Sequence, residues 1–202
     1  MFSINTINTT TSQLLEGLFD RTNDDAWREC DARYRPIIIS FARKLGLSEE
    51  DAADVAQETL TKFLSEYQAG KYDRTRGRLG SWIVGIAKYR IADLKRSRMR
   101  RREQRGGSAI ADLPDDDSLE ALWEAEVRRA ILNRSVSGLR KETRMNPRTI
   151  RAFEMIALEQ KSAPEVAKEL GMSVNDVYVA KNRTIERLRK IRDVLSAAYE
   201  LG

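Results

Sequence analysis

Two neighbouring segments of the chain carry charged side chains in patterns that suit partners of opposite charge. The first, EEDAADVAQETLTKFLSEY at residues 49–67, places its carboxylates on one side of a helical wheel and its apolar residues on the other. The second, LGSWIVGIAKYRIADLKRSRMRRREQR at residues 79–105, has apolar residues at helical spacing and ends in a cluster of arginines. Because carboxylates repel nucleic acid and arginines attract it, the two segments predict surfaces for two different partners.

The acidic segment predicts an amphipathic helix. Ser48 followed by Asp51 suits its first turn, where a hydroxyl and carboxylates satisfy free N–H groups and the helix dipole. Its expected buried stripe consists of Ala52, Ala56, Leu60, Phe63, Leu64 and Tyr67. Its expected polar face consists of Glu50, Asp51, Asp54, Gln57, Glu58, Thr61 and Ser65. An ordinary solvated face is the alternative interpretation, because most surface helices carry charge on their outer side.

The basic segment continues beyond its last apolar position, Leu94. Its cluster consists of Lys95, Arg96, Arg98, Arg100, Arg101, Arg102 and Arg105. Arginine binds phosphate as a planar fork, so the cluster suits a nucleic-acid backbone; a solvated face or linker is the alternative. The connector before it adds Lys71, Tyr72, Arg74, Arg76 and Arg78. An aromatic ring among basic residues is typical of a surface that stacks a base while it holds a backbone.

Composition excludes several classes of protein. The 202 residues carry 36 basic and 31 acidic side chains, a formal net charge of +5, and no histidine. Without histidine, an ordinary zinc site and the Ser/His/Asp and Cys/His catalytic arrangements are excluded, and the single Cys30 excludes an internal disulfide. No run of about 18 apolar residues predicts a membrane span, and the first dozen residues lack the features of a secretion signal. We therefore expect a protein without a cofactor or a metal. Paired carboxylates are a catalytic arrangement that the composition still allows, although no such pair lies in an apolar setting that would raise a pKa.

Apolar spacing predicts an all-α protein with two small helical domains joined by a flexible linker. The expected helices cover residues 14–20, 24–45, 49–67, 79–102, 119–139, 147–160, 163–170 and 174–199. Pro36 predicts a kink in the second helix, and Cys30 is expected to face its core. Gly106, Gly107, Pro114 and the aspartates 115–117 indicate the linker. Those aspartates keep a linker soluble, or alternatively lie against the basic surface and mimic nucleic acid.

The C-terminal segment APEVAKELGMSVNDVYVAKNRTIERLRKI, residues 163–191, predicts a helix-turn-helix. Ala167 is small where two helices cross, Gly171 tolerates a left-handed turn, and Val177 holds the second helix on the first. Either Ser173 or Asn175 can cap the second helix. An unrelated helical hairpin is the alternative. In the helix-turn-helix interpretation the second helix enters the major groove, and its candidate DNA contacts are Asn175, Asp176, Tyr178, Val179, Lys181, Asn182, Arg183 and Arg187.

Together, these motifs resemble bacterial RNA polymerase sigma factors of the extracytoplasmic-function type. DAADVAQETLTKFL at residues 51–64 is similar to the family's Asp-Ala-Glu-Asp-Leu-Val-Gln-Glu-Thr-Phe pattern. SWIVGIAKYRIADLKR at residues 81–96 is similar to its Trp-Leu, Ile-Ala-Arg-Asn and Asp-x-Leu-Arg pattern, although Tyr89 and Arg90 depart from it. Residues 178–181 also depart from the usual C-terminal pattern. The resemblance covers about residues 24–105 and 145–193.

The resemblance implies partners and roles for these residues. The acidic helix would bind core RNA polymerase through Asp51, Asp54, Gln57 and Glu58. The minus-ten promoter element would be opened and read by Lys71, Tyr72, Arg74, Arg76, Arg78, Trp82, Lys88, Arg90, Lys95 and Arg96. The helix-turn-helix would read the minus-thirty-five element, and an anti-sigma protein is a further candidate partner.

The implied organisation has four parts. They are an arm at 1–23, a region 2-like domain at 24–105, a linker at 106–118 and a region 4-like domain at 119–202. The expected function is that of an alternative sigma factor, which binds core polymerase, directs it to promoters and assists melting. An autonomous helix-turn-helix transcriptional regulator is the alternative, and a DNA-processing enzyme is disfavoured because no nucleophile or metal constellation is recognisable.

Overall fold

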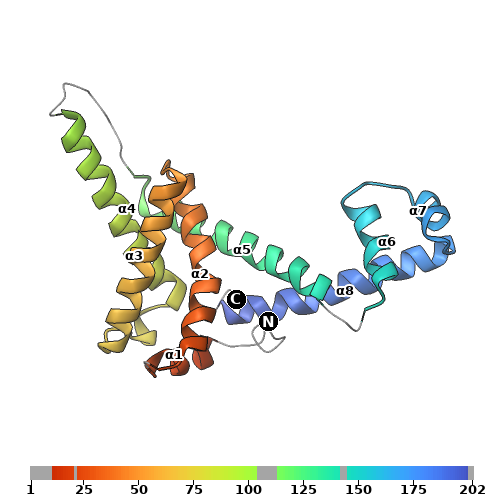
Figure 1. Ribbon diagram of the computed structural model, residues 1–202, viewed down its shortest axis with the longest axis horizontal. Coiled ribbons are helices and arrows are strands. Elements are labelled where there is room, and N and C mark those ends of the chain that lie inside the picture. The colour runs from red at the N-terminus through yellow and green to blue at the C-terminus, as the bar shows by residue number, and fades with distance from the viewer. Residues whose placement is uncertain (1–10, 21, 104–112, 142–144, 200–202) are drawn as a thin grey trace. The chain divides into compact units, whose positions relative to one another are not determined.

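The computed structural model describes residues 11–20, 22–103, 113–141 and 145–199. Within these ranges the regular elements are helical, which confirms the all-α fold class. The α-helices are α1 (Thr11–Phe19), α2 (Asp24–Lys44), α3 (Glu49–Gln68), α4 (Leu79–Glu103), α5 (Asp116–Lys141), α6 (Pro147–Ala157), α7 (Ala163–Leu170) and α8 (Val174–Ala198), and a short 3₁₀ helix, η2, covers Arg74–Arg76 (Figure 1).

The chain divides into two compact units. The first comprises Met1–Ala130 with Ala198–Gly202, and the second comprises Ile131–Ala197. The boundary therefore differs from the linker predicted at 106–118. Residues 106–112 of that linker lie outside the described residues, and Asp116 already belongs to the first turn of α5. The first half of α5 joins the first unit because Leu119, Trp123 and Val127 are buried.

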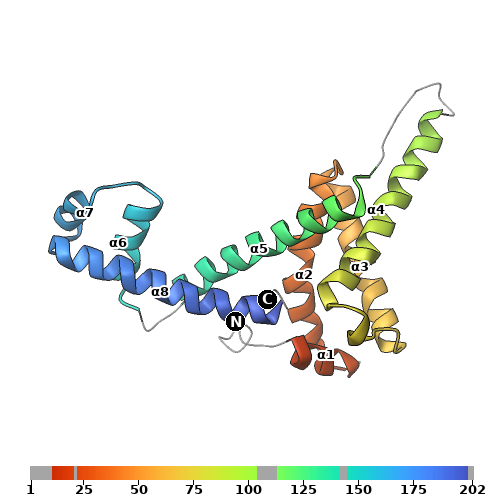
Figure 2. The ribbon, with the colours of Figure 1, turned by 180° about the vertical axis from the view of Figure 1, so that it is seen from behind.

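The core of the first unit comes from the apolar stripes that the sequence predicts. Helices α2, α3 and α4 lie side by side (Figures 1 and 2) and α1 packs on α2 and α3. Each stripe repeats at three- and four-residue intervals, so each helix buries one face. Cys30 is fully buried in this core, and desolvation raises the pKa of its thiol to about 12. The main buried side chains are Tyr34, Ile37, Ile38, Phe41, Ala52, Ala56, Leu60, Phe63, Leu79, Ile83, Ala87 and Ile91.

Part of the predicted N-terminal arm forms a helix in the first unit. Residues 11–19 form α1, whose Leu14, Leu15 and Leu18 are buried. The phenol of Tyr67 donates a hydrogen bond to the carbonyl of Leu15 at 2.7 Å, which ties α3 to α1. The first ten residues of the arm lie outside the described residues.

The C-terminal end of α8 belongs to the first unit. Arg33, which is buried, pairs with Glu29 at 3.1 Å and donates to the carbonyl of Ala198 at 2.9 Å. The ring of Tyr199 lies 5.4 Å from the Arg33 guanidinium, and its hydroxyl donates to the Arg33 carbonyl at 3.2 Å. A buried arginine is tolerated only when paired and bonded in this way.

The second unit has its own smaller core. It is formed by Ala152, Met155, Ala163, Val166, Ala167, Val177 and Ala180, with Ile156, Leu170 and Met172 packed at its edge. These residues come from α6, α7, the turn at Met172 and the start of α8, so the three helices pack around one core.

Candidate protein and nucleic-acid interfaces

The acidic face of α3 is engaged with the helices beside it. Asp51 accepts hydrogen bonds from the Ser48 hydroxyl and from the Arg98 guanidinium of α4, and these hold the pKa of its carboxyl below the usual 3.8. Glu58 pairs with Arg90 of α4 at 3.4 Å. The predicted acidic and basic surfaces therefore meet along one side of the α3–α4 pair.

Two further residues complete the predicted polymerase-binding set. The amide oxygen of Gln57 accepts from Arg35 of α2 at 2.7 Å, and the same arginine is bonded to Asp31. Asp54 is exposed on α3, and no partner for it is found among the described residues. Asp54 thus presents a solvated carboxylate between two residues that are already paired.

An aromatic cluster lies where the connector meets α4. The ring of Tyr72 stacks on that of Trp82, with centroids 5.1 Å apart and planes inclined by 18°. Trp82 also meets Phe63 of α3 edge to face at 5.5 Å, and Tyr67 lies beside both Phe63 and Tyr72. Tyr72 and Trp82 are both half-buried. The cluster therefore offers an aromatic platform with a partly solvated edge.

The connector itself is fixed by local hydrogen bonds. Asp73 accepts from the backbone N–H and the hydroxyl of Thr75, which lowers the pKa of its carboxyl and caps η2. Arg74 donates to Ser12 of α1 at 2.8 Å, and Lys71 pairs with Glu66 at 3.4 Å. Arg76 is exposed. The predicted basic residues of the connector are thus held on the surface of the first unit.

Helix α4 carries the remaining residues of the predicted minus-ten surface. Arg78, just before α4, pairs with Glu124 of α5 at 3.4 Å, and Lys88 pairs with Asp116 at 3.3 Å. Arg96 donates to the carbonyl of Ala92 in its own helix at 3.2 Å, and Lys95 is half-buried. The side chains of Arg101, Arg102 and Arg105 lie outside the described residues.

The predicted turn between α7 and α8 has the expected geometry. Gly171 ends α7 in a left-handed conformation at φ +58°, and the N–H of Met172 bonds to the carbonyl of Ala167 at 2.9 Å. Arg148 of α6 donates to the carbonyls of Leu170 and Gly171, the latter at 2.8 Å. The orphan carbonyls at the end of α7 are therefore satisfied by a side chain from a third helix.

The first turn of α8 is capped by Ser173 rather than Asn175. The Ser173 hydroxyl accepts from the N–H of Asp176 at 3.0 Å and donates to the Asp176 carboxylate at 2.7 Å. This bond uses one carboxylate oxygen of Asp176 for the cap. Of the predicted DNA contacts, Asn175, Asp176, Tyr178, Val179, Asn182 and Arg183 are exposed, whereas Lys181 and Arg187 are half-buried.

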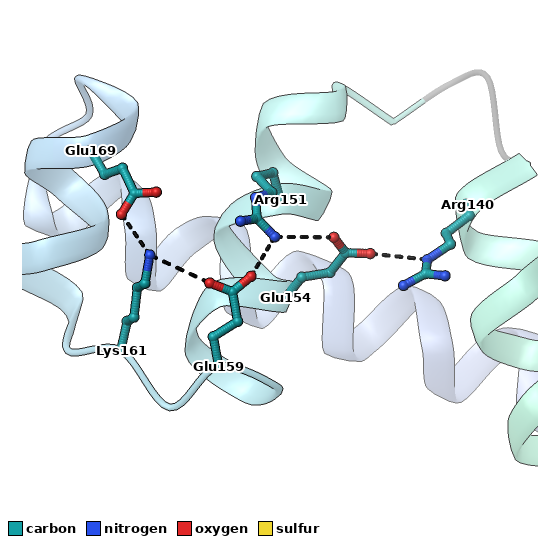
Figure 3. Close-up of polar contacts among 6 residues, drawn as sticks. All are labelled: Arg140, Arg151, Glu154, Glu159, Lys161 and Glu169. Atoms are coloured by element: carbon teal, nitrogen blue, oxygen red, sulfur yellow. Dashed lines mark hydrogen bonds and ion pairs between the residues drawn. The ribbon is translucent and has the colours of Figure 1, made fainter.

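Ion pairs join the helices of the second unit at its surface (Figure 3). Arg140 pairs with Glu154, Arg151 bridges Glu154 and Glu159, and Lys161 bridges Glu159 and Glu169, with the closest contact 2.5 Å between Arg151 and Glu159. Arg151, followed by Lys161, lowers the pKa of Glu159. The chain of pairs connects α5, α6, the following loop and α7 on the solvent side.

Several residues with a role in these surfaces were not singled out by sequence reasoning. Arg148 reaches a turn more than twenty positions along the chain. Tyr89, which the sequence identifies only as a departure from the family pattern, is 65% exposed on α4 between Lys88 and Arg90. Asp116, Glu120 and Glu124 repeat at helical spacing, which predicts from the sequence that they share one face of a helix. The sequence does not predict which residues that face contacts. Within the described ranges no helix is long and apolar enough to cross a bilayer, and no group of potential metal ligands gathers.

Comparison with known proteins agrees with the motifs. Residues 31–101 match the family model described as Sigma-70 region 2. The chain is 28% identical over 172 residues to the ECF RNA polymerase sigma factor ShbA of Streptomyces griseus, an alignment that covers 80% of this chain and 85% of that one. A solved structure, that of CnrH in complex with the cytosolic domain of CnrY, aligns with 91% of this chain and 97% of its own at 21% identity and a TM-score of 0.38. Residues 31–101 are therefore similar to sigma-70 region 2, and the chain is similar over most of its length to an RNA polymerase sigma factor of the extracytoplasmic-function type.

Proposed function

We propose that the protein is an alternative sigma factor that binds core RNA polymerase, directs it to particular promoters and assists their melting. The observation that carries this proposal is the sigma-70 region 2 match at residues 31–101, which includes both the acidic face of α3 and most of the basic face of α4. The protein would act in the cytoplasm with the polymerase, without catalytic chemistry of its own.

The acidic face of α3 is the proposed polymerase-binding surface. Asp54 is exposed, and the ion pair of Glu58 with Arg90 joins two partly exposed side chains. Exposed ion pairs are individually weak, so a basic partner can exchange for Arg90. Asp51 and Gln57 flank these residues and would extend the same contact.

The aromatic cluster and the basic connector are the proposed minus-ten surface. Base stacking on an aromatic side chain contributes roughly 1–3 kcal/mol per base. The stacked Tyr72 and Trp82 supply such rings beside Arg76 and Arg78, which suit phosphates. A strand that is unpaired during melting would be stabilised there, because bases offer their faces only when they leave the duplex.

The first turns of α8 are the proposed minus-thirty-five surface. Asn182 and Arg183 are exposed on the helix that follows the turn at Gly171 and can donate to base edges or phosphates. Tyr178 and Val179 are also exposed and offer apolar contact to a thymine methyl group.

Charge reversal tests the polymerase assignment. The variant Asp54→Lys/Glu58→Lys should lose co-elution with core polymerase, because it places two cations where a basic partner surface would bind. The matched control Glu16→Lys/Asp193→Lys makes the same change in net charge at exposed positions of α1 and α8 and should still co-elute. Retained binding by the first variant, with an unchanged far-ultraviolet spectrum, would overturn the assignment.

Transcription tests the function as a whole. Core polymerase with this protein should initiate at a restricted set of sites on genomic fragments, read by sequencing run-off transcripts, and core polymerase alone should not. Tight, sequence-specific binding of duplex DNA by the purified protein, with no effect on initiation, would instead support an autonomous regulator.

A further inference from the structure

Helix α5 presents a row of carboxylates to the first unit. Asp116, Glu120 and Glu124 are spaced four residues apart, so they lie on one face at intervals of about 6 Å along the helix axis. A regular row of negative charge is also what a nucleic-acid backbone presents. None of these three residues is needed for the core, because the buried positions of this part of α5 are Leu119, Trp123, Glu126 and Val127.

The row of carboxylates runs antiparallel to the start of α4. Glu124 pairs with Arg78 at 3.4 Å, Glu120 accepts from the Ser81 hydroxyl at 3.2 Å and lies 3.9 Å from Lys88, and Asp116 pairs with Lys88 at 3.3 Å. From Glu124 to Asp116 the residue numbers fall along α5, while those of the partner residues rise from Arg78 to Lys88. The Lys88 side chain is only 19% exposed between its two carboxylates. Arg78 and Lys88 both belong to the predicted minus-ten surface.

Apolar packing, rather than the ion pairs, fixes this part of α5. Trp123 is buried and meets Phe41 of α2 edge to face at 5.6 Å. A Cβ atom added to Gly80 would lie 3.5 Å from the indole nitrogen of Trp123, so α4 approaches α5 closely at a glycine. Glu126 accepts from the Ser40 hydroxyl of α2 at 2.5 Å. These contacts hold α5 in place independently of the ion pairs, and the three carboxylates therefore face α4 even when the ion pairs are broken.

We propose that the acidic row Asp116–Glu120–Glu124 is an internal competitor for nucleic acid, which occupies part of the basic face of α4 until DNA displaces it. This inference rests on the proposed DNA-binding role of α4. The pair of Arg78 with Glu124 joins two partly exposed side chains, and Asp116, which pairs with Lys88, is itself exposed. Ion pairs at the surface are individually weak, so a polyanion can replace them without unfolding the unit. The row lowers the affinity of the free protein for DNA and has less effect once a strand is bound.

The test compares neutralised variants of the full-length protein in DNA titrations. Glu120→Gln/Glu124→Gln removes two carboxylates of the row, and Glu16→Gln/Asp117→Asn removes two exposed carboxylates outside it. Both raise the net charge equally, so the control reports the effect of charge alone. Binding of a fluorescent single-stranded oligonucleotide is measured by anisotropy over a range of salt concentrations, and thermal unfolding checks that each variant is folded.

The first variant should bind the oligonucleotide roughly threefold to tenfold more tightly than the control. Its plot of log affinity against log salt should be steeper by roughly 0.7, because Arg78 loses its pair with Glu124 and becomes available to a phosphate, whereas Lys88 keeps its pair with Asp116. If the two variants bind the oligonucleotide with equal affinity and equal salt dependence, the proposal that the acidic row competes with nucleic acid is wrong.

A third variant separates this outcome from failure of the proposed function. Arg78→Gln/Lys88→Gln should weaken binding by the otherwise unchanged protein. If it binds as tightly as the unsubstituted protein, then α4 is not the DNA-binding face and the promoter assignment itself is wrong. If it binds weakly while the Glu120/Glu124 variant matches its control, only the competitor is wrong.

Discussion

At the scale of single residues, the sequence predicts which side chains face solvent better than it predicts their partners. Ser48 and Asp51 are recognisable as the start of a helix, and the structure places them there. That Asp51 also binds Arg98 follows from the packing of α3 on α4, because the two residues are 47 positions apart. The sequence alone therefore does not show which charged side chains are unpaired in the fold and available to bind another molecule.

Replacement of the Ser48 cap should destabilise the first unit in a pH-dependent way. Ser48→Ala removes the acceptor for the N–H of Asp51, which should cost about 1 kcal/mol at pH 7. It also removes the main cause of the lowered pKa of Asp51. A lowered folded-state pKa stabilises the protein above the ordinary value of 3.8 and loses that effect as the pH falls through the folded value. The difference between the variant and the unsubstituted protein should thus shrink below about pH 3.8.

Urea denaturation at several pH values measures this difference. Ser65→Ala, at an exposed position of the same helix, serves as the control and should change stability little at any pH. A constant difference for Ser48→Ala down to acid pH would show that the hydroxyl acts only on the backbone.

At the scale of elements, the turn between α7 and α8 combines a local requirement with a distant one. Gly171 is required locally because its φ is +58°, a conformation that other L-residues adopt at a cost. The distant contribution is Arg148, whose guanidinium lies 3.0 Å from the position that a Cβ atom at Gly171 would take. The glycine is readable in the sequence, whereas the arginine is not.

Two glycine-to-alanine substitutions should have opposite effects. Gly171→Ala should destabilise the second unit by about 1–2 kcal/mol, because it forces a side chain into the left-handed region and towards Arg148. Gly85 is a solvent-exposed residue in the middle of α4, where an added Cβ atom meets nothing within 4 Å. Gly85→Ala should therefore stabilise the first unit by about 0.5–1 kcal/mol. Denaturation followed by circular dichroism measures both, and a destabilising Gly85→Ala would contradict the helix-propensity argument.

At the scale of the whole molecule, the two units of the fold differ from the domains that the sequence predicts. The helix bounds agree closely, because apolar spacing, caps and glycines are local signals. The unit boundary does not agree, since the predicted division at 106–118 ignores the burial of Leu119, Trp123 and Val127 in the first unit. The last residues also join the first unit through Arg33 and Tyr199.

The tryptophans allow the two units to be followed separately. Trp27, Trp82 and Trp123 all belong to the first unit, so their fluorescence should report its unfolding. Tyr199→Ala should lower the free energy of unfolding of the first unit by about 3 kcal/mol, because it leaves a cavity at a buried site beside Arg33. Met155→Ala, in the core of the second unit, should cost a similar amount by circular dichroism and leave the fluorescence transition nearly unchanged. Equal shifts of the fluorescence transition would show that the units unfold together.

Residue types at short spacing are enough to predict the helices, the helix-turn-helix and the resemblance to sigma factors. Which charged side chains meet depends instead on how the helices pack. Asp51 and Glu58 are paired with arginines of α4, and Arg78 and Lys88 are paired with carboxylates of α5. Such pairs join residues far apart in the chain, and the packing of apolar faces brings them together. Charged side chains that the sequence predicts to be exposed and unpaired, such as Asp51 and Lys88, therefore already form ion pairs in the folded protein.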